Sequence, residues 1–177
     1  RQELLSAVLG DVLEIGFGTG LNLPHYPDAI RKLTTVDPNP GMHRLARKRI
    51  QQIGIEVDQR MLRGEQLPFD ENSFDTVVST FTLCSIDQVD QATTEVFRVL
   101  KPGGQFLFLE HGLSTEPNVQ KWQHRLNRLE MWLADGCHLD RNIKDIVAAP
   151  SFWQINCDEF YLEQTPKILG YLYRGAA

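Results

Sequence analysis

A glycine-rich loop and two acidic residues near the beginning of the chain carry the clearest chemical signal. Gly16, Gly18 and Gly20 directly follow a short apolar run. Glu14 lies within that run, and Asp37 ends the next one. Such a loop lets a ligand approach the backbone closely, while the carboxylates suit an ammonium group and ribose hydroxyls. The pattern therefore indicates a site for a positively charged nucleoside.

The glycine spacing differs from that of dinucleotide-binding loops. In the pattern Gly-x-Gly-x-x-Gly, the third glycine would fall at Leu21 or at Leu23, depending on where the count starts. Glu14 would also repel a diphosphate. A nicotinamide-dependent reductase is therefore the weaker alternative. Each residue could also serve only as a strand end or turn former.

Composition and charge are those of one ordinary folded domain over residues 1–177, with 42% hydrophobic and 23% charged residues. The net charge of -5 would repel a phosphate backbone, so we expect no nucleic-acid partner. No apolar stretch approaches the ~18 residues of a membrane-spanning helix. The three cysteines are widely spaced, which suits neither a disulfide framework nor a zinc site. We expect no metal and a cytoplasmic location.

Short apolar runs alternate with helical patterns along the chain. Strands are expected at residues 12–15, 33–36, 55–62, 74–78 and 106–109, with an antiparallel pair at 152–161 and 168–174. Helices are expected at residues 1–9, 41–52 (capped by Asn39), 88–100, 116–134 and 140–148. This order predicts an α/β fold: a Rossmann-like, seven-stranded, mostly parallel sheet with an antiparallel C-terminal edge hairpin and helices on both faces.

The helix expected at residues 116–134 carries two rows of side chains. Its apolar row should pack against the sheet and consists of Val119, Trp122, Leu126, Leu129 and Leu133. Lys121, Arg125 and Arg128 form a basic row that Trp132 continues. This second row could address an anionic lipid surface, although a solvated face is the favoured interpretation. Peripheral membrane contact stays open as a partner interaction.

Ordered motifs along nearly the whole chain carry a family resemblance. The segments VLEIGFGTG (12–20), LPF (67–69), FD (74–75) and RVLKPGG (98–104), together with Asp37, resemble class I S-adenosylmethionine-dependent methyltransferases with a methyltransferase type 11 domain. S-adenosylmethionine is thus the implied cofactor. The implied contacts are Gly16, Phe17, Gly18 and Gly20 along its methionine portion, Asp37 and Pro38 at the ribose, Gly64 and Glu65 at adenine, and Ser79 and Thr80 beneath the sulfur, with Glu14 at the ammonium group.

A narrower resemblance rests on DPNP (37–40), TLCS (82–85), EH (110–111) and DGCHL (135–139). These motifs are similar to the family that includes the membrane-associated alkyl-thiol methyltransferases of animals. The resemblance implies a small-molecule acceptor, with a thiol as one candidate, and an acceptor pocket formed by Thr82, Cys84, Asp135 and His138. The chain begins at Arg1, so we expect a preceding helical segment to be missing, including the part that anchors the animal members.

Methyl transfer from a sulfonium is a displacement that positioning in a dry pocket accelerates, without a metal or a covalent intermediate. His111 is the candidate base for a thiol acceptor, or else a histidine bonded at a strand end. Asp140 either shapes the acceptor pocket with Asp135 and His138 or caps the next helix. Cys84 has no activating partner in the sequence and is interpreted as pocket lining.

Other functions remain compatible with the same fold. A noncatalytic module could keep the cofactor site without an acceptor pocket. Transfer of an aminopropyl group from a decarboxylated cofactor is a further alternative, in which Glu14 would lose part of its purpose.

Overall fold

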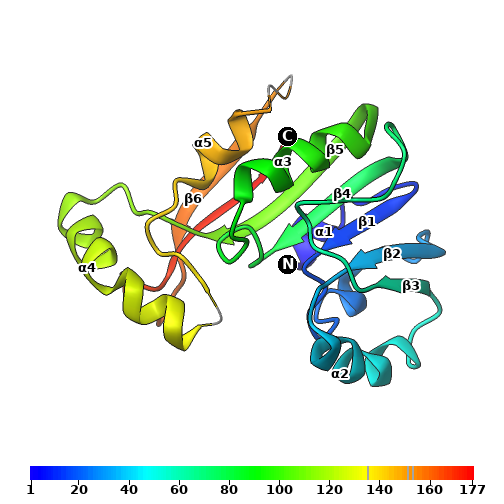
Figure 1. The fold of residues 1–177 in the computed structure, drawn as a ribbon, viewed down its shortest axis with the longest axis horizontal. Helices are drawn as coiled ribbons and strands as arrows, with labels where there is room; N and C mark the ends of the chain where they lie inside the picture. Colours follow the sequence, from blue (N-terminus) through cyan, green and yellow to red (C-terminus); the bar gives the residue numbers. More distant parts are fainter. Residues whose placement is uncertain (135, 151, 153) are drawn as a thin grey trace.

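The computed structural model describes residues 1–134, 136–150, 152 and 154–177. Seven strands form one sheet in the order β3-β2-β1-β4-β5-β7-β6 (Figure 1). They are β1 (Val12–Ile15), β2 (Lys32–Val36), β3 (Glu56–Arg60), β4 (Phe74–Thr80), β5 (Leu100–His111), β6 (Asn156–Tyr161) and β7 (Tyr171–Ala176). The pairs among β1 to β5 are parallel, whereas β7 is antiparallel to both β5 and β6. The predicted Rossmann-like sheet with its C-terminal edge hairpin is confirmed.

The helices are α1 (Gln2–Leu5), α2 (Pro40–Ile50), α3 (Val89–Val99), α4 (Pro117–Leu133) and α5 (Ile143–Ala148), with a 3-10 turn η1 (Leu23–His25). Asn39 caps α2 as predicted, because its side chain accepts a hydrogen bond from the Gly41 N–H at 2.8 Å. Asn142 caps α5, so the alternative that Asp140 caps this helix is wrong. The Asp140 carboxylate lies 3.7 Å from the His138 ring instead.

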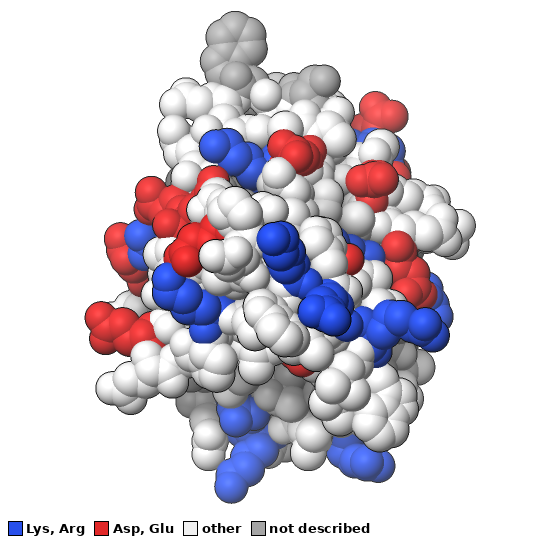
Figure 2. Space-filling view, turned by 90° about the vertical axis from the view of Figure 1, so that its left-hand side faces the viewer, with Lys and Arg blue, Asp and Glu red and all other residues white. Residues whose placement is uncertain are grey.

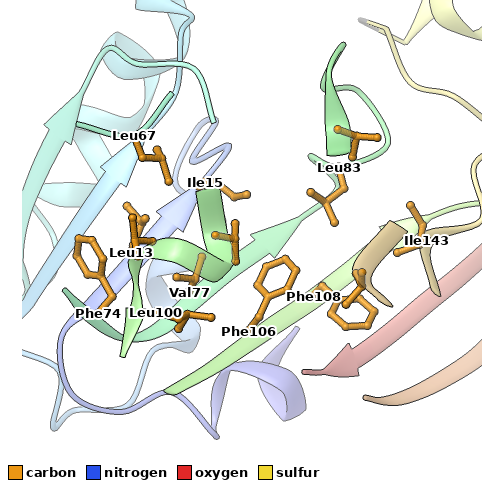
Figure 3. Close-up of a cluster of buried hydrophobic side chains, with 14 of the residues drawn as sticks. Leu13, Ile15, Leu67, Phe74, Val77, Leu83, Leu100, Phe106, Phe108 and Ile143 are labelled. Carbon is orange, nitrogen blue, oxygen red and sulfur yellow. The ribbon is translucent and has the colours of Figure 1, made fainter. Parts of the chain in front are cut away.

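Both faces of the sheet are covered. On one face, α3 and α5 pack over strand residues such as Leu13, Val77 and Phe106, which Figure 3 shows converging in one cluster. On the other face, α1 and α2 cover Leu33 and Val78. Because successive strand side chains point to opposite faces, strands buried on both sides appear as continuous apolar runs. This explains why the sequence pattern located the central strands.

The predicted boundaries fail where pairing extends or shortens a strand. β5 begins at Leu100, directly after α3, although Pro102 and Gly103 indicate a loop there. Leu100 pairs with Phe74, and the register shifts between Phe74 and Thr76, so the strand continues around a local irregularity. The edge strand β3 and the helix α1 are both shorter than expected.

The apolar row of α4 does not pack against the sheet as predicted. The helix projects from the body of the molecule at the left of Figure 1, and Trp122 and Leu133 are 51% and 63% exposed. Only the Val119 end of the row is buried, since no layer lies opposite the rest. α4 is anchored by polar contacts: buried Gln123 accepts from the Ser114 N–H and donates to the carbonyl of Gly112.

Among the residues that the structure describes, no helix combines the length and the apolar character needed to cross a bilayer.

Candidate functional site

A cavity of about 650 Å³ lies beyond the carboxyl ends of β1, β2 and β4, where open α/β sheets bind their ligands. A smaller cavity of about 150 Å³ adjoins it. Gly16, Gly18 and Phe81 line both. The larger volume falls within the roughly 300–1,000 Å³ range of small-molecule sites.

Most of the predicted cofactor residues meet at these cavities. The larger one is lined by Gly16, Gly18, Asp37, Pro38, Gly64 and Glu65, and the smaller one by Glu14, Phe17 and Thr80. Two predicted residues are placed elsewhere. Gly20 packs against Leu23, and Ser79 is buried beneath the site, where its hydroxyl donates to Glu110.

The turn after β1 requires glycine at its first position. Gly16 has a φ of +69°, and a Cβ atom there would lie 2.0 Å from the Thr82 hydroxyl oxygen. No other residue fits without moving the segment after β4. The close approach of these two segments forms the wall that both cavities share.

Asp37 connects the glycine loop to the end of β2. One carboxylate oxygen accepts from the Gly18 N–H at 2.7 Å and the other from the Asn39 N–H at 2.8 Å. The carboxylate is therefore fixed by backbone donors at the edge of the large cavity. Each oxygen retains capacity to accept a further hydrogen bond.

Glu14 is buried in the floor of the smaller cavity. Its carboxylate accepts from the Asn22 amide at 2.8 Å and from the Tyr26 hydroxyl at 2.6 Å. Burial raises the pKa of Glu14 to about 7, although both hydrogen bonds oppose the shift. Sequence reasoning missed Asn22 and Tyr26, which flank the short turn η1 and have no motif of their own.

An internal cation already lies in the smaller cavity. The Arg1 guanidinium donates to the Thr80 hydroxyl at 3.0 Å and to the Asn22 side chain, and it lies 5.0 Å from the centre of the Phe81 ring. Attraction to Glu14 partly offsets its burial. The cavity is therefore chemically suited to a positively charged group.

Glu110 organises the other side of the site. This buried carboxylate accepts from the Ser79 hydroxyl at 2.6 Å and from the backbone N–H groups of Thr82 and Cys84. Burial raises its pKa above the ordinary value. These bonds hold the segment after β4, in which Phe81 adopts a positive φ of 55°. The resemblance marked Glu110 only as part of a motif, without this role.

Two cysteines and a histidine meet behind this segment. The His111 Nδ1 lies 3.8 Å from the Cys137 Sγ, and its ring centre lies 4.8 Å from that of Phe81. The hydrogen bond to Cys137 is the largest cause that raises the pKa of Cys84, and burial is the second. The same hydrogen bond lowers the pKa of Cys137. The wide sequence spacing of the cysteines concealed this cluster. None of the three residues is among those that line the cavities.

The structure brings only some of the residues predicted for the acceptor pocket close to one another. The His138 N–H donates to the Cys84 carbonyl at 2.8 Å, which joins the segment after α4 to the segment after β4. Burial lowers the pKa of the His138 ring, which lies 3.5 Å from the Asn127 amide. Thr82 lines the large cavity. Asp135 lies outside the described residues.

Comparisons with known proteins agree with this geometry. Residues 13–108 match the family described as a methyltransferase domain. The thiol S-methyltransferase TMT1B of Rattus norvegicus is 38% identical over 145 residues, which cover 78% of this chain and 58% of that protein. The phosphatidylethanolamine N-methyltransferase of Cereibacter sphaeroides is 30% identical over 166 residues, which cover 93% of this chain and 77% of that protein.

A solved structure shows the same fold. Phosphoethanolamine N-methyltransferase 2 of Haemonchus contortus superimposes with a TM-score of 0.74 at 16% identity, over 99% of this chain and 51% of that chain. This chain spans 58% of the rat relative's length. The family match nevertheless covers more than half of the chain, including the glycine loop, Asp37 and the segment after β4. The chain belongs to the family of S-adenosylmethionine-dependent methyltransferases.

Proposed function

We propose that this chain binds S-adenosylmethionine across the two joined cavities and transfers its methyl group to a small-molecule acceptor, with a thiol as the preferred class. One observation carries the proposal: Glu14 near the end of β1 and Asp37 directly after the parallel neighbour β2 both lie at the cavities beside the glycine loop. A cationic amino-acid end and a ribose would fit these two carboxylates.

The two cavities divide the cofactor between them in this proposal. Asp37 would accept hydrogen bonds from the ribose, and Gly64 and Glu65 would face the adenine. The smaller cavity would hold the methionine end, with Glu14 at the ammonium group. The Arg1 guanidinium in the same cavity supports this fit, since it shows that a cation is accommodated there.

The chain's own residues would position the reactants and exclude water. S-adenosylmethionine supplies an electrophilic methyl group when it is bound. Thr80, Phe81 and Thr82 lie where the two cavities meet and would orient the acceptor beside it. His111 remains the base predicted from the sequence, and a positioned base typically contributes about 10²–10⁴-fold.

The preference for a thiol is supported by the printed activity of the rat relative. The bacterial relative is named for methylating a lipid amine, so a headgroup amine is the competing acceptor. The described cysteines are free thiols, which fits the proposed reducing, cytoplasmic location.

We also propose peripheral membrane contact through α4, in place of the solvated interpretation favoured from the sequence. Exposed Trp122, Leu129, Trp132 and Leu133 share this helix with exposed Lys121, Arg125 and Arg128. Figure 2 shows this side of the molecule, where Lys and Arg side chains are interspersed with uncharged ones and with several Asp and Glu side chains. Apolar and basic side chains on one helix are typical of helices that bind anionic lipid surfaces.

An acceptor screen tests the proposed reaction. The purified chain is incubated with S-adenosylmethionine and one acceptor at a time: an alkyl thiol, an amine, a phenol or a lipid-headgroup amine. Formation of S-adenosylhomocysteine is measured in each incubation. We expect turnover with thiols. Turnover only with the headgroup amine would overturn the thiol preference, and turnover with no acceptor would favour a noncatalytic binding module.

Cofactor binding is tested separately by calorimetry with S-adenosylhomocysteine. Asp37→Ala should weaken binding at least tenfold, because charge-assisted bonds are each worth about 1.5–3 kcal/mol. Asp58→Ala on β3, whose carboxylate pairs with Arg60, is the matched control and should leave binding unchanged. An unchanged affinity in folded Asp37→Ala would contradict the assignment.

A further inference from the structure

Three side chains with soft or borderline metal-binding atoms converge beside the proposed acceptor site. Cys84 follows β4, His111 ends β5, and Cys137 follows α4. One ligand atom from each, two sulfurs and a ring nitrogen, all lie within 4.8 Å of one another. Among the described residues, no other group of three or more His, Cys, Asp or Glu side chains has this geometry.

The spacing of these atoms matches a tetrahedral zinc site. Zinc takes cysteine sulfur at about 2.3 Å and histidine nitrogen at about 2.0–2.1 Å, so ligand atoms in a tetrahedron lie roughly 3.5–3.8 Å apart. The Cys137 Sγ and His111 Nδ1 are already 3.8 Å apart. The other pairs lie within 4.8 Å and need to approach by at most about 1.3 Å, which side-chain rotation provides. Two thiolates and a neutral imidazole balance the charge of a divalent cation.

The backbone around the three side chains is held in place. Glu110 accepts from the Cys84 N–H, and the Cys84 carbonyl accepts from the His138 N–H next to Cys137. His111 is fixed by the pairing of β5 with β7. The Arg141 guanidinium donates to the Leu83 carbonyl, and both its charge and the buried Glu110 carboxylate act on Cys137. The protein has therefore preassembled the positions, as a metal site requires.

We propose that Cys84, His111 and Cys137 bind one thiophilic divalent cation, Zn²⁺, and that its open fourth position holds the acceptor thiol. Three protein ligands with one open position are the arrangement of catalytic zinc sites. Cys84 lies between Thr82 and Ser85, which both line the large cavity, so the buried cluster lies directly behind this part of the cavity wall. The second part of the proposal rests on the proposed thiol methyltransferase function.

The acceptor thiol loses its proton to solvent and binds zinc as a thiolate. A sulfur lone pair of the thiolate then forms the new bond to the methyl carbon, and the bond from that carbon to the sulfonium breaks with both electrons going to the cofactor sulfur. The products are a neutral thioether, which is a weak zinc ligand, and S-adenosylhomocysteine. A zinc-bound His111 cannot accept the proton, so this role replaces its proposed role as base.

Metal binding is tested without reference to activity. The chain is stripped with a chelator in the presence of a phosphine reductant, and Zn²⁺ is titrated in competition with a chromophoric chelator. We expect one Zn²⁺ per chain, and Co²⁺ in its place should give sulfur-to-metal charge-transfer absorption. Losing a ligand should weaken Zn²⁺ binding more than about 100-fold, because even losing an outer hydrogen-bond partner of a ligand weakens it 10–100-fold.

The third cysteine provides a matched control. Cys84→Ser and Cys137→Ser should lose Zn²⁺ binding, whereas Cys157→Ser, on the edge strand β6, should retain it. Retained S-adenosylhomocysteine binding shows that each variant is folded. No Zn²⁺ uptake by the folded parent chain, or equal uptake by all three variants, would overturn the site.

The acceptor role has its own outcome. Chelation should abolish thiol turnover and leave S-adenosylhomocysteine binding unchanged, and Zn²⁺ should restore the turnover. Turnover that survives complete removal of zinc would overturn the acceptor role while leaving the proposed function intact. Zn²⁺ binding without turnover of any acceptor would instead overturn the proposed function and leave the metal site standing.

Discussion

The two halves of the site are built in different ways. The donor half, formed by the ends of β1 and β2, is local: the glycine loop and Asp37 lie at the ends of two consecutive strands joined only by a connection with the short turn η1, and they are linked by a 2.7 Å hydrogen bond. The acceptor half comes from the ends of β4 and β5 and the segments around α4. Its cluster joins Cys84 to Cys137 across a long stretch of sequence.

This difference separates what the fold imposes from what the chain adds. The donor half uses backbone N–H groups and a turn that demands glycine, so it follows from the parallel pairing of β1 and β2 and the loop between them. The acceptor half depends on side chains placed by loops, in which specificity is usually encoded. Substitutions in the donor half should therefore damage the fold and the cofactor site together. Those in the acceptor half should separate stability from function.

The largest effect is expected at the first glycine of the loop. Gly16→Ala combines a positive φ of +69° with an overlap on Thr82. Strain of about 1–3 kcal/mol and overpacking of about 1–3 kcal/mol predict a loss of roughly 2–6 kcal/mol in the free energy of unfolding. Gly18→Ala, with a φ of +56° but open space, should lose only about 1–2 kcal/mol. Urea denaturation measures both.

Gly54→Ala is the control for this series, because no atom lies within 4 Å of the added Cβ and its φ is ordinary. Its stability should match that of the parent chain. If Gly16→Ala proved as stable as Gly54→Ala, the shared wall between the two cavities would not be rigid, and the comparison of the two halves would fail.

The sequence predicted the residues of the proposed donor half because the signals for them are local. The loop, Asp37 and the Asn39 cap each depend on a few consecutive residues, and burial on both faces makes the central strands continuous apolar runs. The acceptor half offered no such signal. Cys137 meets His111 only after α4 has been placed, and the apolar row of α4 gave no indication that the sheet ends before covering it. Tertiary packing determines both the contact between Cys137 and His111 and the exposure of the apolar row of α4.

A smaller effect, about tenfold, is expected from the titration of Glu14. Burial raises its pKa from 4.5 to about 7, so the neutral form stabilises the ligand-free protein. This contribution is complete below pH 4.5 and is lost as the pH rises through about 7. A ligand ammonium favours the carboxylate, so binding releases a proton below pH 7. Affinity for S-adenosylhomocysteine should therefore rise about tenfold from pH 6 to pH 8.

Calorimetry in buffers of different ionisation enthalpy would detect the released proton. Glu14→Gln should bind more weakly and show a flat pH profile, whereas Glu163→Gln, in the exposed turn between β6 and β7, should behave like the parent chain. A tenfold rise that persists in Glu14→Gln would assign the titration to another group, and the donor half would lose its second carboxylate.

The smallest effect on stability is expected at the exposed residues of α4, which belongs to the acceptor half. Trp132 and Leu133 are 79% and 63% exposed, so replacing both with serine should change the free energy of unfolding by less than about 0.5 kcal/mol each. Gln123→Ala in the same helix is the matched contrast. It leaves the Ser114 N–H and the Gly112 carbonyl without their partner and should lose about 1–3 kcal/mol.

The same exposed side chains should matter for lipid surfaces, because burial of apolar area and attraction to anionic headgroups act together. Co-sedimentation with phosphatidylglycerol vesicles should therefore fall in the Trp132→Ser, Leu133→Ser double variant, and also in an Arg125→Glu, Arg128→Glu variant. Binding by the parent chain should weaken at high salt and on uncharged phosphatidylcholine vesicles. If the double variant still binds vesicles like the parent chain, α4 is not the contact. If the parent chain forms dimers that the double variant does not, a second copy of the chain covers this helix instead of a membrane.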